Sequence, residues 1–273
     1  MLSGKRKNNE THTRWRRGIF TMIVLILMGI GLICTYLLIG LELFQGQAFP
    51  AAHLVYRTED AQYSLNLQTG ERIQGPRRSP NHGLTSLSPD GRWLASWLWI
   101  APYNEWKLSL QDSKTLHMLS SLVKCICYGG SLSWSPDSQW ITYSAMPNST
   151  SREYPQESLE ELWLININTH ERRQITDNSV RDMAPAFSPD GTHIAYISAA
   201  DGENRLYVMD IATGQSRLLT PSTTGYRARW SPDGQWIAFT TSPDKIKSLW
   251  IVRANGTQAQ MIVEAVTSFE WQS

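Results

Sequence analysis

The chain has 273 residues, of which 41% are apolar and 18% charged, and its formal net charge is +1. This is the composition of an ordinary globular protein, so it excludes a disordered chain and allows one or two domains with a hydrophobic core. Three cysteines are too few for a disulfide scaffold.

The first predicted element is a membrane span at residues 19–41. These 23 residues carry no charge, and as a helix they would extend about 34 Å, enough to cross a bilayer core of about 30 Å. The alternative is a cleaved signal peptide, because Gly46 and Ala48 give a small-x-small pattern like that of a cleavage site. The apolar core of such a peptide is usually only about 7–15 residues long, so an uncleaved anchor is favoured.

The flanks of this span predict its orientation. Residues 1–18 contain six basic residues, and no Lys or Arg follows the span before Arg57. By the positive-inside rule, residues 1–18 form a cytoplasmic tail and residues 42–273 lie outside the membrane, with 42–52 as a linker. Subtracting the tail from the totals leaves 19 basic and 23 acidic residues outside, so we expect no nucleic-acid partner.

Beyond the linker, one heptapeptide recurs four times. Its copies are LSPDGRW from Leu87, WSPDSQW from Trp134, FSPDGTH from Phe187 and WSPDGQW from Trp230. Ser, Pro, Asp and Gly suit successive positions of a type I β-turn, so the motif predicts a reversal between two strands. Ser138 replaces the glycine in the second copy, which costs turn stability if that position needs a positive φ.

Three strand positions align around these turns, and each occurs five times. A short strand ends before each turn at an apolar residue, namely Leu87, Trp134, Phe187 or Trp230, and a fifth such strand contains Trp271 in the terminal segment SFEWQS. A β-rich segment follows the turn, and it also occurs once before the first copy, from His53. An alternating segment with a central aromatic comes third, and those aromatics are Tyr63, Trp106, Trp163, Tyr207 and Trp250. Tight turns at Gly70, Gly214 and Gly256 then lead into a fourth strand.

The unmatched strands at the two ends predict the architecture. The unit that begins at His53 lacks its first strand, and a fifth first strand is expected in the terminal segment SFEWQS, residues 268–273. If that strand joins the unit from His53, no sheet edge is left open. We therefore predict an all-β fold, a five-bladed β-propeller over residues 53–273 preceded by one transmembrane α-helix, with six blades as the alternative.

These repeats resemble the TolB-like β-propeller family. The resemblance rests on SPDG followed by an IAF-like strand, then LYVMDIATG and RLLT, and its best copy is residues 185–220. It implies a propeller that serves as an extracytoplasmic binding module or that gates a separate hydrolase domain. TolB itself has an N-terminal α/β domain and six repeats, so the resemblance does not extend to TolB's partner.

Few residues suggest catalysis. A glycosidase needs two carboxylates that converge from the first strands, yet only Glu270 lies within them, with Asp182 just ahead of the third. A serine hydrolase would need a G-x-S-x-G elbow and an α/β domain, and neither is found. We predict no catalytic residues.

No cofactor or metal site is expected either. The motif aspartates Asp90, Asp137, Asp190 and Asp233 are expected to cap turns. Cys125 and Cys127 have no second Cys or His pair nearby in the sequence, so a structural or disulfide role is favoured over a metal. Residues 201–204, DGEN, fit a hairpin turn better than a calcium loop.

Loops on one face predict the binding surface. The connections at residues 75–83, 122–130 and 146–158 are long and irregular, and such loops often bind partners. Two neighbouring segments are unusually apolar, and together they give Trp97, Trp99, Ile100, Pro102, Tyr103, Val123, Cys125, Ile126, Cys127 and Tyr128. We predict a partner-binding patch at Trp97, Trp99, Ile100, Tyr103, Val123, Ile126 and Tyr128. The alternative is that the second strand runs long and its tryptophans pack between blades.

The sequence therefore predicts a single-pass protein of the cell membrane. Its propeller would be a non-catalytic module for protein interaction or assembly, plausibly an accessory subunit of a multisubunit membrane complex. It would contact lipid through residues 19–41 and bind protein partners in or at the membrane. A carbohydrate- or envelope-binding sensor is the alternative, and a five-bladed glycosidase a lesser one.

Overall fold

The computed structural model describes residues 53–58, 61–75, 85–100, 105–125, 131–146, 159–220, 227–241 and 247–272. Within these ranges no helix has both the length and the apolar character needed to cross a membrane. The predicted tail, membrane span and linker at residues 1–52 lie outside them. Chain contacts divide the protein into two compact units, and all described residues except Gln68–Gly70 belong to the second.

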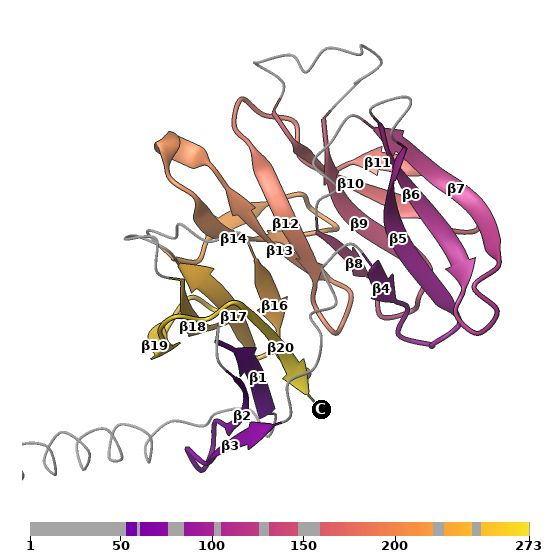
Figure 1. Ribbon diagram of the computed structural model, residues 1–273. Helices are drawn as coiled ribbons and strands as arrows, with labels where there is room; N and C mark the ends of the chain where they lie inside the picture. Colours follow the sequence, from indigo (N-terminus) through magenta and orange to yellow (C-terminus); the bar gives the residue numbers. More distant parts are fainter. Residues whose placement is uncertain are drawn as a thin grey trace, which may run out of the picture. The chain divides into compact units, whose positions relative to one another are not determined.

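The described residues form five antiparallel sheets of four strands each (Figure 1). The first sheet has the order β20 (Ser268–Gln272), β1 (His53–Arg57), β2 (Gln62–Asn66) and β3 (Arg72–Gly75). The second has β4 (Thr85–Leu87), β5 (Trp93–Ile100), β6 (Glu105–Asp112) and β7 (Met118–Cys125). The third has β8 (Leu132–Trp134), β9 (Trp140–Ala145), β10 (Glu161–Asn166) and β11 (Arg172–Gln174). The fourth has β12 (Asp182–Phe187), β13 (His193–Ser198), β14 (Arg205–Asp210) and β15 (Ser216–Leu218), with a short 3-10 helix η2 (Ala200–Gly202). The fifth has β16 (Ala228–Trp230), β17 (Trp236–Thr241), β18 (Ser248–Arg253) and β19 (Gln260–Val263).

The last strand completes the first sheet, as the strand count predicted. β20 pairs antiparallel with β1, in a register that runs from His53 opposite Gln272 to Arg57 opposite Ser268. The backbone N–H of Thr267 also donates to the carbonyl of Arg57 at 2.6 Å. The two ends of the described region are therefore joined in one sheet, and the edge of β1 is covered.

The four SPDG-type motifs are turns between the first and second strands of their sheets. In each, the fourth residue donates its N–H to the carbonyl of the serine at 2.9 Å. The fourth residues are Gly91, Ser138, Gly191 and Gly234, and all have φ between 61° and 74°. The glycines suit this left-handed conformation, while Ser138 adopts it at a cost of about 1 kcal/mol.

Ser138 gains a contact that the glycines cannot make. Its side chain is buried, and its hydroxyl accepts a hydrogen bond from the backbone N–H of Asp90, in the turn of the preceding sheet, at 3.0 Å. The turn of the fourth sheet likewise packs on the turn of the third sheet before it. A Cβ placed on Gly191 would lie 3.4 Å from Cδ of Pro136. Successive turns therefore lie against one another.

Tryptophans link the first strands of neighbouring sheets. The indole N–H of Trp134 donates to the carbonyl of Ser86 at 3.1 Å, that of Trp230 to Ala186 at 3.0 Å, and that of Trp271 to Arg229 at 3.1 Å. These bonds join the second sheet to the third, the fourth to the fifth, and the fifth to the first. Figure 1 shows three of these first strands, β8, β12 and β16, side by side. The edge of each sheet that its first strand forms is called the inner margin below.

Leu87 and Phe187 end first strands without such a tryptophan link. Leu87 is 55% exposed, and its side chain, unlike an indole, has no N–H that could donate to a neighbouring strand. The residue at this place in the fourth sheet is Phe187, whose backbone N–H donates to the hydroxyl of Ser133 instead. Among the described residues that end the first strands, Leu87 is thus the most exposed.

Candidate interaction surface

The predicted patch is divided by burial. Trp97 is 2% exposed and packs edge to face on Tyr143 of the third sheet, with ring centroids 5.9 Å apart. Val123 is 4% exposed and lies in the same core cluster. These two residues therefore follow the alternative stated for the patch, in which the side chains pack in the core between sheets. Tyr103, Ile126 and Tyr128 lie outside the described residues.

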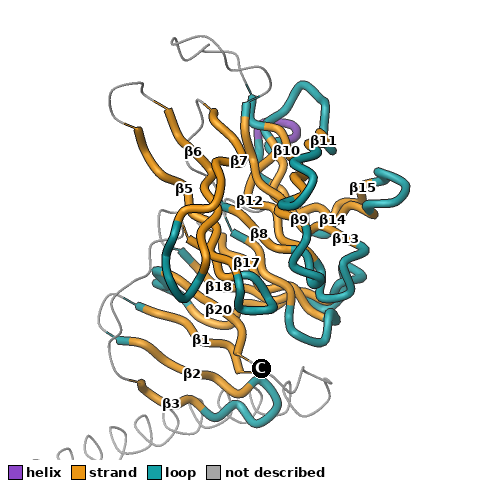
Figure 2. The backbone as a smooth tube through the Cα atoms, turned by 90° about the vertical axis from the view of Figure 1, so that its right-hand side faces the viewer, coloured by secondary structure: helices purple, strands orange, loops and turns teal. Residues whose placement is uncertain are grey.

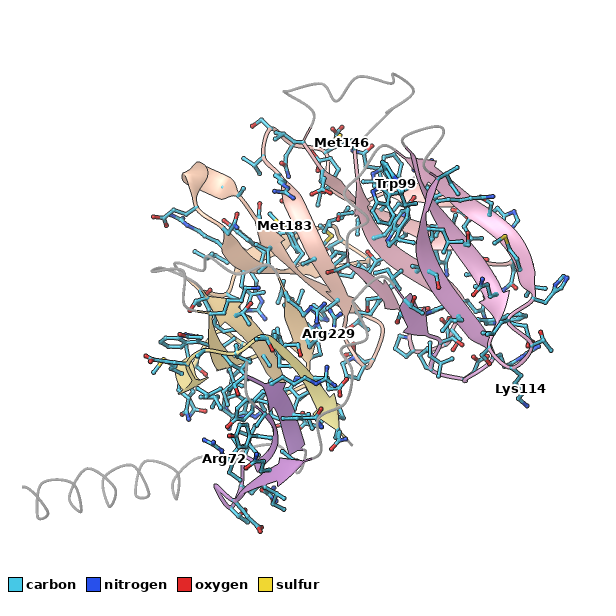
Figure 3. All side chains as sticks on the ribbon, in the orientation of Figure 1. Arg72, Trp99, Lys114, Met146, Met183 and Arg229 are labelled. Carbon is cyan, nitrogen blue, oxygen red and sulfur yellow. The ribbon has the colours of Figure 1, made fainter. Side chains whose placement is uncertain are left out.

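Among the described residues of the patch, Trp99 is the accessible aromatic, with 42% of its surface exposed. It faces Trp106 across the β5–β6 hairpin, in direct register, with ring centroids 5.3 Å apart. Ile100 follows it at the end of β5 and is half-buried. Figure 3 shows Trp99 among side chains at the end of this hairpin. The described part of the predicted patch is therefore a pair of tryptophans with a flanking isoleucine.

The geometry of β5 explains why Trp97 and Trp99 differ. β4 pairs only with the first part of β5, and its last contact is Thr85 opposite Ser96. Beyond Ser96, β5 continues beside β6 alone, as the long hairpin in Figure 2 shows. Trp97 still reaches the third sheet, whereas Trp99 lies beyond that cover.

The outer edge of the same sheet is a further apolar surface that was not predicted from the sequence. β7 has eight residues, while the other outer strands, β3, β11, β15 and β19, have three or four. Met118 and Leu119, at the start of β7, are 44% and 49% exposed, and Leu116 in the preceding turn is exposed too. The signal available in the sequence was an apolar group, LHML, beside a hairpin turn.

The acidic residues considered for catalysis do not form an exposed pair. Asp182 is fully buried, and one of its carboxylate oxygens accepts a hydrogen bond from the side-chain amide of Asn178 at 2.8 Å. Beside it, Glu161 accepts from the hydroxyl of Thr176 at 2.6 Å and the backbone N–H of Asn178 at 3.1 Å. Burial raises the pKa of both carboxyl groups. Glu270 is exposed on β20, in another sheet.

The motif aspartates cap their turns, as predicted. In every copy the carboxylate accepts from the motif serine at 2.5–2.6 Å and from the backbone N–H two residues further on at 3.0 Å. The pKa of Asp190 is lowered by the hydroxyl of Ser188 and the N–H of Thr192. Among the described residues no group of three or more His, Cys, Asp or Glu side chains could hold a metal ion.

Two hollows lie among these turns. One, of about 460 Å³, includes Trp140 and Phe187 and lies between the turns of the third and fourth sheets. The other, of about 410 Å³, lies between the turns of the fourth and fifth sheets and includes Trp230 and Arg217. Each hollow is lined by residues of two successive turns. We therefore attribute both hollows to the repeated packing of turns and not to a separate site.

Five four-stranded sheets, a C-terminal strand that completes the first sheet, and turns packed from sheet to sheet define a β-propeller-type protein. The family model of the TolB beta propeller domain matches residues 130–269, and the chain belongs to this family.

Curated relatives match only part of this chain. A TolB homologue of Chlorobium luteolum is 28% identical over 141 residues, which are 51% of this chain and 29% of that protein. Dipeptidyl-peptidase 5 of Porphyromonas gingivalis is 34% identical over 96 residues, 33% of this chain and 14% of that enzyme. The chain thus spans less than a third of these relatives. A solved structure of a putative TolB from Agrobacterium tumefaciens superposes with a TM-score of 0.58 at 17% identity, over 78% of this chain and 77% of that one, which supports the fold alone.

Proposed function

We propose that the chain is a membrane-anchored module for protein interaction, whose propeller lies outside the cytoplasm and binds its partner through the second sheet. Residues 19–41 would anchor it in the cell membrane, with residues 1–18 in the cytoplasm. On this proposal it is an accessory subunit of a larger membrane complex and carries out no catalysis.

The observation that carries this proposal is the exposure of Trp99, whose ring packs against that of Trp106. Large aromatic side chains on a surface are favoured anchors of protein interfaces, because they bury a large area with little loss of side-chain freedom. The long edge strand β7 adds exposed apolar side chains to the same sheet, at Met118 and Leu119. No other described tryptophan is as exposed, so this sheet is the best supported docking surface.

The test is co-purification of the full chain from its native membrane in mild detergent, followed by mass spectrometry. We expect a partner in stoichiometric amount, and we expect Trp99→Ala to weaken its binding about 30-fold, the effect of removing an anchor worth about 2 kcal/mol. Leu218→Ala is the matched control, because Leu218 is 43% exposed on the fourth sheet. It should leave the partner bound.

Three results would count against this proposal. Equal recovery of the partner with the Trp99→Ala variant and with the wild type would show that the partner does not bind at this surface. Binding of cell-wall polysaccharide by the purified chain, lost in Trp99→Ala, would favour the carbohydrate-binding alternative. Glycoside hydrolysis that disappears in Glu270→Gln would favour the enzyme.

A further inference from the structure

Two arginines occupy an unusual place at the inner margin of the fifth sheet. Arg227 directly precedes β16 and Arg229 is its central residue. The corresponding central residues of β4 and β8 are Ser86 and Ser133. A short polar side chain is thus replaced here by a guanidinium, and a second one lies two residues away on the same face of the strand.

The contacts of β16 show which way this face points. Ala228 is fully buried in a cluster that includes Met183 of the fourth sheet, and Trp230 donates its indole N–H to that sheet. Strand residues alternate, so Arg227 and Arg229 point the opposite way, towards β20. The indole N–H of Trp271 in β20 donates to the carbonyl of Arg229. Figure 3 shows Arg229 beside β16, close to β20.

The positive charge of Arg229 is poorly compensated. Its guanidinium donates to a backbone carbonyl, that of Ala228, at 2.9 Å, and no ion pair joins it to a described carboxylate. Burial, together with the smaller effect of the neighbouring charge of Arg227, lowers the pKa of Arg229 to about 10. The carboxylate of Glu270 acts on Arg227 and raises its pKa against the effect of burial. Two arginines and one glutamate leave one net positive charge in a partly buried place.

A partly buried charge normally has a partner of opposite charge, because removal from water is costly. A single negative charge would neutralise this group, which favours a carboxylate over a doubly charged phosphate. Guanidinium groups bind carboxylates through paired N–H donors. We propose that Arg227 and Arg229 bind the carboxylate of a ligand beside β16 and β20, where the inner margins of the fifth and first sheets are in contact.

Thermal unfolding of the full chain in detergent tests this site with three probes. They are acetate, acetyl-Gly-Gly-Ala with a free C-terminal carboxylate, and the same peptide amidated, all at constant chloride. A carboxylate at ten times its Kd should raise the unfolding midpoint by about 3–6 °C. A peptide affinity at least tenfold above that of acetate identifies a protein C-terminus as the ligand, and equal affinities identify a free small carboxylate.

Variants decide whether the arginines are responsible. Arg229→Gln and Arg227→Gln should abolish the carboxylate-induced shift, and Arg229→Lys should weaken binding at least tenfold, because lysine lacks the paired donors. The exposed Arg173→Gln is the matched control and should keep the shift.

The same variants can overturn the proposal. No shift in the wild type, the same shift in Arg229→Gln, or an equal shift with the amidated peptide would contradict it. In chloride buffer alone, Arg229→Gln should unfold at or above the wild-type midpoint, because an uncompensated charge is removed. A clearly lower midpoint, or failure to fold together with undiminished binding in Arg229→Lys, would show a structural role instead.

Discussion

Replacing Trp134 with Phe tests how the sheets are held together. Trp134 is buried, and its indole N–H donates to the carbonyl of Ser86 in the preceding sheet at 3.1 Å. Phenylalanine fills part of the space but cannot donate. Loss of the hydrogen bond costs about 1 kcal/mol, and the void left by the smaller ring costs about 1 kcal/mol more. We expect a loss of about 2 kcal/mol, or about 4–8 °C in the unfolding midpoint.

Circular dichroism of the full chain in detergent measures this midpoint. Trp99→Phe is the matched control, because it makes the same chemical change at an exposed position, where we expect less than about 0.5 kcal/mol. Similar small shifts in both variants would refute the idea that the tryptophan links contribute to the stability of the propeller.

Four further substitutions, at three positions, test the turns and the buried acid. Ser138→Ala should cost about 1 kcal/mol in urea unfolding, because the N–H of Asp90 loses its acceptor, whereas Ser138→Gly should be near neutral, since glycine also relieves the positive φ. Burial raises the pKa of Asp182, so its stabilising contribution is present below its ordinary pKa and is lost as pH rises through the raised value. Asp182→Asn should therefore gain stability relative to wild type between pH 3 and pH 7, and a constant difference would contradict this. The pKa of Asp190 is lowered, mainly by Ser188, so Asp190→Asn should cost more at pH 7 than at pH 3, where the wild type loses this contribution.

The repeated elements could be predicted from the sequence because each rests on local chemistry. The SPDG motif specifies its own turn, and the positive φ of Ser138 follows from alignment with three glycines. The pairing of β20 with β1 is a contact between distant segments, yet counting strands was enough to predict it. Because the motifs repeat, the strands could be counted, and the count predicted the topology of the sheets.

The candidate surface could not be predicted to the same extent. Trp97 and Trp99 are two residues apart on one strand, and only the short length of β4 and the position of the third sheet decide that one is buried and the other exposed. The bulge between Met183 and Ala186, where Pro185 lacks a backbone N–H, was also not apparent. Such features depend on how neighbouring sheets meet, and a single sequence does not encode that in a readable pattern.

The central feature of the fold is the pairing of β20 with β1 in the first sheet, and a cysteine pair tests this pairing directly. Arg57 and Ser268 face each other across β1 and β20, so their Cβ atoms should be about 5 Å apart, close to disulfide distance. In a chain whose native cysteines are replaced by serine, Arg57→Cys with Ser268→Cys should form an intramolecular disulfide on mild oxidation, detected by mass spectrometry of unreduced peptides. Arg57→Cys with Gln272→Cys should not, because Gln272 lies four residues further along β20, about 13 Å away. Failure of the first pair to crosslink, or equal crosslinking of both, would contradict the fold.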